Sequence, residues 1–288
     1  MISTRELPLS IDGPWPGLSN HVMDSRYSSH SPLLKGSVII GMGYDDVPLI
    51  FNFDNPETGA ILIVGDTGSG KTKLLCNILR CAGFFNTDQV SISMIANEHY
   101  LASHFGLEGM HLVISRPNTP EATDNLANLV LLAKKRLARM NKLPIIMLAI
   151  EDLVKVYERL NLEVQEGLVW LLQNGPQAGI WPLCTITPSE TRNTQLHGDV
   201  LKSFGTHLWG HIQSPGTGFG LNPAQAAPLS CLVPGREFCL RLDSGWLCFR
   251  VFDPYQAAIE GLLPSCHIPN TLFNATRGGH HEYWHVMV

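Results

Sequence analysis

A glycine-rich segment that ends in a lysine and a hydroxyl side chain is the part of the sequence best equipped for chemistry. It fits the pattern G-x-x-x-x-G-K-[ST] at every fixed position. Its residues are Gly65, Asp66, Thr67, Gly68, Ser69, Gly70, Lys71 and Thr72. Glycines let the backbone curl around phosphate groups with its N–H groups pointing inward. The pattern therefore predicts a loop that binds the phosphates of a nucleoside triphosphate, which we take to be ATP.

The last residues of this segment predict how the triphosphate is held. Lys71 should reach the β- and γ-phosphates, and the Thr72 hydroxyl should bind Mg²⁺. Lys73 follows directly and joins the nucleotide-binding candidates. A chance glycine loop in a strand-to-helix turn is the alternative. The apolar residues before the loop (ILIV) and after it (KLLCNIL) argue against that alternative, because they predict a buried strand and a helix whose N-terminus faces the anion.

Two adjacent acids, Glu151 and Asp152, follow the apolar stretch 144–150. A P-loop site needs an acid at the end of a neighbouring strand to hold Mg²⁺, and often a second acid to orient the attacking water. The alternative is that both acids only cap the helix that follows. Because the stretch has the character of a buried strand, we assign Glu151 to Mg²⁺ together with Thr72. We assign Glu151 and Asp152 to catalysis together with Lys71.

Strands and helices alternate along the chain around these residues. Such alternation predicts an α/β fold with a mostly parallel sheet flanked by helices. Apart from the strands beside the P-loop and before the two acids, we expect strands at 37–41, 47–52, 90–96, 110–115, 181–187 and 206–212, helices at 119–141 and 160–174, and a C-terminal β-hairpin made of 236–242 and 246–252.

The two ends of the chain do not show this periodicity. Residues 1–35 are rich in Ser, Pro, Gly and His, which is typical of an extended arm, and 265–288 form a polar and aromatic tail. We therefore expect one domain at 36–264. The tail histidines include His280, His281 and His285. Without an acid or a cysteine at ligand spacing, these three predict no metal site.

The charge of the chain gives no support by itself for nucleic-acid binding. The net charge is -5 and the pI is about 6.2, so no global basic field is present. Four basic residues near the end of the helix predicted at 119–141 could still meet a DNA backbone, or else form an ordinary solvated face. They are Lys134, Lys135, Arg136 and Arg139.

The seven cysteines indicate a reducing compartment. Their number is odd, no C-x-x-C pair occurs, and most lie in apolar runs, where a free cysteine behaves as a small hydrophobe. We therefore expect no disulfide framework. The N-terminus has no apolar signal region, and the apolar run 144–150 is far shorter than the ~20 residues of a membrane helix. A cytoplasmic protein without a membrane segment is the expectation.

Six collinear segments resemble the FtsK/HerA class of ring-forming motor ATPases, and the FtsK motor core in particular, over about residues 37–252. The TGSGKT loop is the highly specific one among them. The segments read VIIGMGYDDVPLIFNF, ILIVGDTGSGKTKLL, LANLVLLAKKRLARM, LPIIMLAIEDL, LLQNGPQAGIWPLCTITPSE and PLSCLVPGREFCLRL. The resemblance implies a RecA-like P-loop NTPase core.

The resemblance also implies a function. It implies an ATP-driven motor subunit that works in a homo-oligomeric ring, taken to be a hexamer, and that translocates or packages double-stranded DNA. Two alternatives stay open. One is a hydrolysis-impaired nucleotide-binding switch or scaffold subunit of a larger assembly, and the other is a ring that translocates protein.

Several positions depart from the pattern of this class. Glu151-Asp152 stands where the class has Asp-Glu, and Asn97-Glu98 replaces an Asp-Pro-Lys stretch. Ile186 stands where the class has a polar Gln that senses the γ-phosphate, and Pro176 where it has an Arg that could complete a neighbouring subunit's site. Candidate substitutes for that Arg are Arg159 and Arg192. The parts for nucleotide binding are therefore intact, while several parts for hydrolysis are altered.

Overall fold

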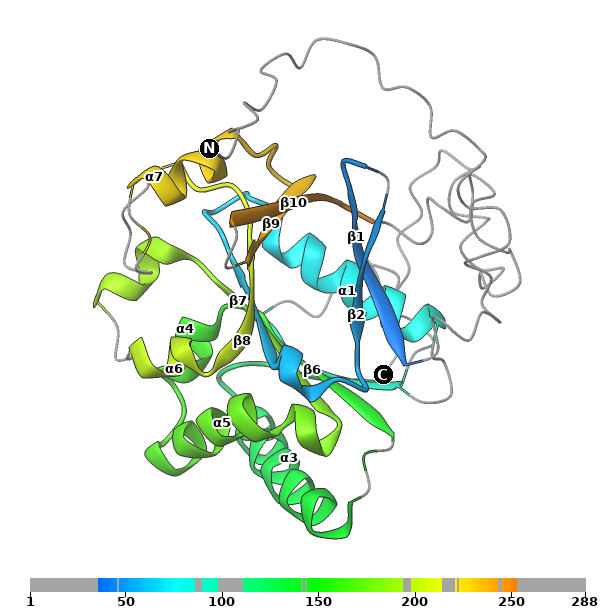
Figure 1. Cartoon of the computed structure of the whole chain (residues 1–288). Helices are drawn as coiled ribbons and strands as arrows, with labels where there is room; N and C mark the ends of the chain where they lie inside the picture. Colours follow the sequence, from blue (N-terminus) through cyan, green and yellow to red (C-terminus); the bar gives the residue numbers. More distant parts are fainter. Residues whose placement is uncertain are drawn as a thin grey trace, which may run out of the picture.

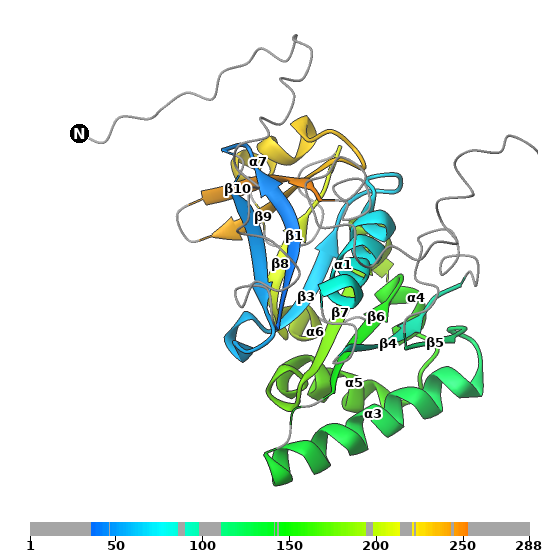
Figure 2. The ribbon, with the colours of Figure 1, turned by 90° about the vertical axis from the view of Figure 1, so that its right-hand side faces the viewer.

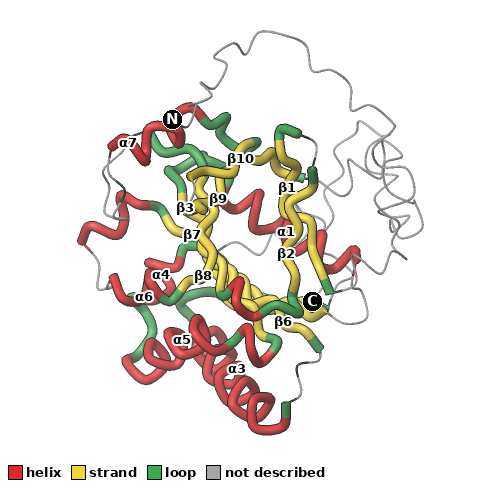
Figure 3. Tube along the Cα trace, in the orientation of Figure 1, coloured by secondary structure: helices red, strands yellow, loops and turns green. Residues whose placement is uncertain are grey.

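The computed structural model describes residues 36–45, 47–85, 90–97, 111–140, 142, 144–193, 198–213, 221, 223–242 and 245–252. In this part of the chain, helices cover both faces of a twisted sheet (Figures 1 and 3). Several predicted features lie outside it. They are the arm at 1–35, Glu98, and the tail at 265–288 with His280, His281 and His285.

A ten-stranded sheet runs through the described residues in the order β2-β1-β10-β9-β8-β3-β7-β6-β4-β5. The strands are β1 (Ser37–Gly43), β2 (Pro48–Asn52), β3 (Ala60–Val64), β4 (Val90–Ile95), β5 (Leu112–Ser115), β6 (Ile145–Ile150), β7 (Ile180–Ile186), β8 (Phe204–Trp209), β9 (Glu237–Leu242) and β10 (Gly245–Val251). The strands from β8 to β5 run parallel, and β9, β10, β1 and β2 continue the sheet in antiparallel pairs. The predicted α/β class is confirmed, and β9 and β10 are the predicted C-terminal hairpin.

The helices of the described residues are α1 (Lys71–Phe85), α3 (Pro120–Arg139), α4 (Leu153–Tyr157), α5 (Leu162–Asn174), α6 (Gly198–Lys202) and α7 (Pro223–Ala226). Helices α3, α4, α5 and α6 lie beside the parallel half of the sheet, whereas α1 also packs on β1 and α7 contacts β10. Short 3-10 helices occupy Pro56–Thr58, Pro176–Ala178, Pro188–Asn193 and Ala227–Cys231. None of the helices in the described ranges has the length and apolar character needed to cross a membrane.

The side chains of β3 explain why helices are needed on both faces. Ile61 and Ile63 pack into the core beneath α1, whereas Leu62 and Val64 pack into the core beneath α3 and α5. Figure 2 shows α1 on one side of the sheet and the pair α3 and α5 on the other. Successive side chains of a strand point to opposite faces. An uninterrupted apolar run such as AILIV therefore requires cover on both sides, and it fixes β3 in the middle of the sheet.

Two helix boundaries differ from the sequence prediction for local reasons. The helix predicted at 160–174 begins at Leu162, because the side chain of Asn161 accepts a hydrogen bond of 2.9 Å from the Val164 N–H and so caps it. Helix α3 ends at Arg139 rather than at 141. Met140 takes a left-handed conformation there, with a φ of 52°.

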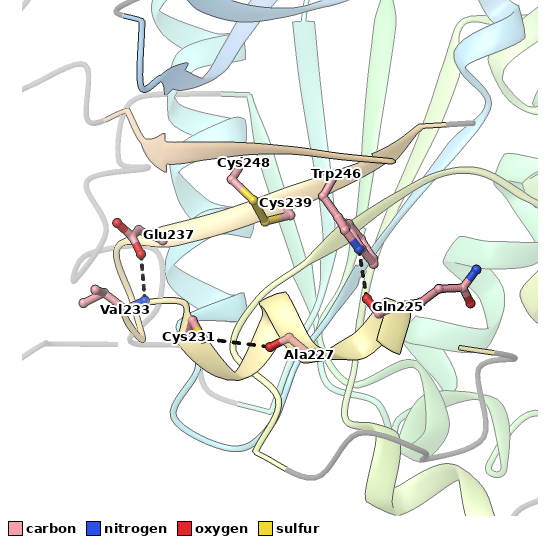
Figure 4. The surroundings of a disulfide bond; sticks show 8 residues. All are labelled: Gln225, Ala227, Cys231, Val233, Glu237, Cys239, Trp246 and Cys248. Carbon is pink, nitrogen blue, oxygen red and sulfur yellow. Dashed lines mark hydrogen bonds between the residues drawn. A yellow bond between two sulfur atoms is a disulfide. The ribbon is translucent and has the colours of Figure 1, made fainter. Parts of the chain in front are cut away.

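A disulfide joins Cys239 on β9 to Cys248 on β10 (Figure 4). The two residues face each other in the antiparallel register, and their Cα atoms are 4.0 Å apart. The expectation of free thiols is therefore wrong for this pair, because the hairpin brings two cysteines of one apolar segment together. The remaining cysteines of the described ranges are not disulfide-bonded. Cys76, Cys81 and Cys184 are buried, and Cys231 is exposed.

The four basic residues near the end of α3 do not form one solvated face. Lys135 and Arg139 are exposed. Lys134 is also exposed, but its ammonium lies over the ring of Trp170 on α5, 5.4 Å from the ring centroid. Arg136 is buried. The group therefore serves partly to hold α3 against α5, which leaves a smaller basic surface than the sequence allowed.

Arg136 links α3 to the loops at its end. Its side chain is 7% exposed, and its Nη1 donates hydrogen bonds to the carbonyl oxygens of Ala178 (3.2 Å) and Lys142 (3.3 Å). Burial lowers the pKa of this guanidinium from its ordinary value. The two carbonyl oxygens accept from its Nη1, and they lie close to the starts of strands β6 and β7.

We expect Arg136→Ala to lower the free energy of unfolding by about 1–3 kcal/mol, because two partly buried carbonyls lose their donor and the packed stem is removed. Arg139→Ala is the matched control, since it removes an exposed arginine of the same helix and should change stability by no more than about 0.5 kcal/mol. Urea denaturation of the full chain measures both. Equal effects of the two substitutions would contradict this role of Arg136.

Candidate nucleotide-binding site

The glycine-rich loop connects the central strand β3 to α1 and is anchored at both neighbouring strands. The Gly65 N–H donates to the carbonyl of Ile186 at the end of β7 (3.3 Å), and the Asp66 N–H donates to the carbonyl of His211 after β8 (3.0 Å). A further bond of 3.0 Å, from the Ser69 N–H to the Asp66 carbonyl, closes the loop on itself. The predicted strand, loop and helix are therefore present, and the loop lies at the carboxyl end of the parallel strands.

Two glycines give the loop its shape. Gly68 and Gly70 have φ values of 81° and 90°, in the left-handed region that side chains disfavour. A Cβ on Gly70 would also lie 2.4 Å from the Cα of Gly235, a residue of the turn that leads into β9. The Gly235 N–H donates to the carbonyl of Ser69 (2.9 Å). The turn before β9 thus packs directly on the loop, a contact that sequence reasoning missed although it noted the glycine-containing segment.

The turn before β9 is itself fixed by a side chain. The carboxylate of Glu237 accepts a hydrogen bond of 2.9 Å from the Val233 N–H (Figure 4). Glu237 is the first residue of β9, so this bond joins the turn to the sheet. The loop is therefore held between strand ends on one side and a rigid turn on the other, which preorganises its backbone for a ligand.

Lys71 is the first residue of α1, and its ammonium turns back into the loop. Its Nζ donates to the carbonyl oxygens of Gly65 (2.8 Å) and Asp66 (3.0 Å). Burial lowers the pKa of Lys71, and the negative charges of Glu190, Asp66 and Asp152 oppose that shift. An ammonium group has three donors, so one more remains for a phosphate oxygen.

Ser69 adds an unsatisfied hydroxyl to the same loop. The residue is 1% exposed, and its Oγ has no hydrogen-bond partner among the described residues. A buried polar atom without a partner is costly and calls for an explanation. Its position inside a glycine loop beside Lys71 suits an interaction with a phosphate oxygen.

Thr72 and Glu151 meet across the site. The Thr72 Oγ1 donates a hydrogen bond of 2.9 Å to Glu151 Oε1. Glu151 follows β6, and its N–H donates to the carbonyl of Ile95 at the end of β4 (2.9 Å). A hydroxyl and a carboxylate are the hard oxygen ligands that Mg²⁺ prefers. The two side chains assigned to Mg²⁺ from the sequence are thus adjacent, and their chemistry fits this ion.

Asp152 is oriented differently from Glu151. Its φ of 61° turns its side chain toward α4, where the carboxylate accepts a hydrogen bond of 3.3 Å from the Lys155 N–H and pairs with the Lys155 ammonium. The Asp152 N–H donates to the Thr185 hydroxyl (2.9 Å). The helix-capping alternative therefore describes Asp152, whereas Glu151 faces Thr72. The assignment of both acids to catalysis stays a prediction.

The other predicted loop residues have distinct surroundings. The Asp66 carboxylate accepts a hydrogen bond of 2.7 Å from the Gln213 N–H, so it fixes the segment after β8. Thr67 and Gly68 are exposed at the tip of the loop. Lys73 is exposed on the first turn of α1, and no bond to the loop is found for its side chain.

The positions that depart from the FtsK/HerA pattern lie as follows. Ile186 is buried in the core and pairs with Val64 in the sheet, so its side chain offers no polar group to the site. Pro176 is buried at the end of α5. Arg159 is exposed in the turn after α4, and the side chain of Arg192 lies outside the described part.

Glu190 is a functional candidate that the sequence analysis did not single out. It lies in the 3-10 helix Pro188–Asn193 after β7, and its Oε1 is 3.4 Å from the Lys155 ammonium. Its Oε2 is buried and has no hydrogen-bond partner among the described residues. No sequence pattern marks it, because only the strand order, with β7 between β3 and β6, brings it to this edge of the sheet.

Solved structures match this fold, although no protein-family model and no curated protein matches the sequence. The structure of ATPases 2 and 3 of Thermomonospora curvata EccC, in complex with a signal sequence peptide, has a TM-score of 0.57 and 14% identity over 75% of this chain and 40% of that chain. ATPases 2 and 3 of EssC from Geobacillus thermodenitrificans have a TM-score of 0.58 and 17% identity over 85% of this chain and 55% of that one.

The chain thus spans about half, or less, of the EccC and EssC structures that it matches. B204, the DNA-packaging ATPase from Sulfolobus Turreted Icosahedral Virus, has 15% identity over 69% of this chain and 98% of that chain, with a lower TM-score of 0.48. At these identities the matches establish the fold. It is the RecA-like fold of FtsK/HerA-type P-loop ATPases, as the sequence resemblance predicted.

The geometry predicts that the two adjacent acids behave differently. Glu151→Gln should weaken the Mg²⁺-dependent part of ATP binding by about 10- to 100-fold, because it removes charge beside Thr72. Asp152→Ala should instead lower the free energy of unfolding by about 1 kcal/mol, through loss of the α4 cap.

Titrations of ATP in the presence of Mg²⁺ and in the presence of EDTA, together with urea denaturation, measure both effects. If Asp152→Ala abolished the Mg²⁺ dependence as strongly as Glu151→Gln, the assignment of Glu151 alone to the ion would be wrong.

Proposed function

We propose that this chain, with its FtsK/HerA-type fold, is an ATP-binding motor subunit that hydrolyses ATP. The domain responsible would be 36–264. The observation that carries the proposal is the meeting of Lys71, Thr72 and Glu151 at the end of the central parallel strands. This is where a P-loop site needs its phosphate-binding ammonium and its Mg²⁺ ligands. The same place in other α/β sheets serves for ligand binding.

The loop and its neighbours would divide the work of binding. The backbone of the glycine loop and the N-terminus of α1 would surround the phosphates. Lys71 would hold the β- and γ-phosphates, and the Ser69 hydroxyl would donate to a phosphate oxygen. Thr72 and Glu151 would hold Mg²⁺, which when bound neutralises charge on the phosphate oxygens. Because Lys71 is partly buried, its charge is screened less by solvent than that of a surface lysine.

Double-stranded DNA is the cargo that the resemblance to the FtsK motor core favours, and a homo-oligomeric ring, taken as a hexamer, is the assembly. The net charge of -5 does not oppose this proposal, since a ring can carry a basic pore and an acidic exterior. The burial of Arg136 removes one of the four basic residues that α3 could have offered to DNA. The basic surface would therefore have to come mainly from other parts of the ring.

Protein is the second candidate cargo. The specific observation in its favour is the match to EccC. EccC is a type VII secretion ATPase, and its ATPases 2 and 3 were solved in complex with a signal sequence peptide. The acidic charge of the chain is also compatible with a protein substrate. In either case the chain could work as one subunit of a larger complex.

A nucleotide-binding switch or scaffold is the remaining alternative. Three features support it: Asp152 caps a helix, Ile186 is apolar and buried, and Pro176 stands where an arginine is expected. ATP turnover would be slow or absent if no other group supplied the missing catalytic side chains. ATP would then hold an assembly together rather than drive movement.

We also propose a cytoplasmic location. The EccC and EssC matches include structures described as cytoplasmic domains. Thiols in that compartment are kept reduced, so the Cys239–Cys248 bond would form there only under oxidising conditions.

ATP turnover with and without long duplex DNA tests the proposed function. The wild-type chain should hydrolyse ATP, DNA should stimulate the rate, and Lys71→Ala should lower the rate at least about 100-fold because a charged phosphate ligand is lost. Lys202→Ala, which removes an exposed lysine of α6, is the matched control and should leave the rate unchanged.

The outcomes separate the candidates. Stimulation by a signal-type peptide instead of DNA would favour a protein cargo. Tight ATP binding without turnover would exclude the motor and favour the switch.

The mass of the full chain in solution tests the ring. With ATP and Mg²⁺ we expect a species of six copies of the 31.7 kDa chain, and a smaller species without nucleotide. Analytical ultracentrifugation measures both. A monomer under both conditions, at concentrations where ATP is bound, would contradict a homo-oligomeric ring.

A further inference from the structure

We propose that Glu190 is the carboxylate that accepts a hydrogen bond from the attacking water during ATP hydrolysis at this site. The inference rests on the proposed ATPase function and names a catalytic residue for it. The role is the one for which Asp152 was expected from the sequence. Four observations carry the assignment: the topology of the sheet, the unsatisfied oxygen of Glu190, its charge relative to Lys71, and the engagement of Asp152.

The topology places the segment after β7 between the two halves of the site. In the sheet, β7 pairs with β3 on one side and with β6 on the other, all in parallel. The phosphate-binding loop follows β3, and the two acids follow β6. Carboxyl ends of neighbouring parallel strands meet at one edge. Glu190, four residues after the end of β7, therefore lies at the same edge of the sheet as the loop and the two acids.

One carboxylate oxygen of Glu190 contacts a lysine, and the other has no hydrogen-bond partner among the described residues. Oε1 faces the ammonium of Lys155 at 3.4 Å, and Lys155 also pairs with Asp152. The Glu190 side chain as a whole is 35% exposed, but its Oε2 atom is buried and finds no hydrogen-bond partner in the described part of the chain. Buried acceptors are almost always satisfied, and an exception calls for an explanation, of which a catalytic role is one. Lys155 thus orients the carboxylate, and Oε2 is the atom able to accept from water.

The charge of Glu190 acts on the phosphate-binding lysine. Burial lowers the pKa of Lys71, and three nearby carboxylates raise it. Of these, Glu190 raises the pKa most, ahead of Asp66 and Asp152. Its charge therefore acts on the ammonium that would hold the γ-phosphate. A group that accepts from the attacking water must lie close to that phosphate.

Asp152 is poorly placed for the same task. Its carboxylate caps α4 through the Lys155 N–H and pairs with the Lys155 ammonium. Its backbone is held in the left-handed region and bonded to Thr185. Moving this carboxylate toward the phosphates would break the cap and the ion pair together. Glu190 keeps its contact with Lys155 through Oε1, and this leaves Oε2 available.

The step balances without a further reactant. The water oxygen attacks the γ-phosphorus and forms a new P–O bond. The bond between the γ-phosphorus and the β–γ bridging oxygen breaks, and its electron pair leaves with ADP. A proton of the water passes to Glu190 Oε2 and from there to the released phosphate or to solvent. One ATP and one water give ADP and inorganic phosphate.

Substitutions at Glu190 test the proposal by separating turnover from binding. Glu190→Gln keeps the shape and an oxygen for Lys155 but is a far weaker acceptor, so it should lower kcat about 100-fold or more while ATP binding persists. Glu190→Asp keeps the charge and displaces it, so an intermediate loss of about 10-fold is expected. Glu158→Gln removes an exposed acid at the end of α4 and is the matched control, which should leave kcat unchanged.

Lys155→Met distinguishes catalysis from a merely structural ion pair. This change removes the Lys155–Glu190 contact from the other side, so it should cost less than Glu190→Gln. ATP turnover and equilibrium ATP binding by the full chain are measured for each variant, and thermal unfolding confirms that each is folded.

Three outcomes would overturn the assignment. Wild-type kcat in Glu190→Gln would show that the carboxylate is not needed. An equal loss of kcat in Lys155→Met would show that only the ion pair matters. If the wild type hydrolysed ATP no faster than Lys71→Ala, the proposed ATPase function would be wrong, and the role of Glu190 with it. The first two outcomes would leave the ATPase function standing.

Discussion

The hydrogen bond between Thr72 Oγ1 and Glu151 Oε1, 2.9 Å long, is the interaction on which the candidate site depends. It joins residues 79 positions apart, one at the start of α1 and one after β6. It forms because β3 and β6 both run parallel to β7, which lies between them, and end at the same edge of the sheet. The long apolar strands, covered on both faces by helices, are thus the framework that brings a hydroxyl and a carboxylate to one point.

The strand between them has a role of its own. Strand β7 holds β3 and β6 in parallel register, and its end provides the carbonyl that accepts from Gly65. Three neighbouring strand ends therefore deliver an ammonium, a Mg²⁺-binding pair and, as we propose, the water-orienting carboxylate of Glu190. The turn before β9 completes the enclosure, since Gly235 packs on the loop from the antiparallel half of the sheet. Both halves of the sheet thus take part in shaping one loop.

Much of this arrangement could be predicted from the sequence because the signals are local. The glycine loop, the apolar strand before Glu151 and the two-strand hairpin each depend on residues close together in the chain. The resemblance to FtsK/HerA ATPases predicted the fold, and the structural matches confirm it. The direction in which a side chain points was harder to predict from the sequence. Whether Asp152 faces a phosphate or caps a helix depends on its φ of 61° and on Lys155, which no periodicity reveals.

Contacts between distant segments explain the remaining differences. Nothing in the pattern around Glu190 or Gly235 indicates that either lies at the candidate site, because only the strand order brings them there. Cys239 and Cys248 are a different case. The predicted hairpin turn already places these positions opposite each other, so the disulfide could have been inferred from register rather than from cysteine count. Arg136 was read as a surface charge because helical spacing alone does not show what the end of α3 packs against.

Hydrogen–deuterium exchange of the full chain with and without MgATP tests most directly whether the glycine loop is the nucleotide site. Slower exchange is expected at 65–75, where backbone N–H groups would bind phosphate, and at the turn 233–236, because Gly235 is bonded to Ser69. Peptides from the exposed end of α3 should be unaffected. Binding of ATP without protection of 65–75, or with protection confined to other segments, would contradict the account.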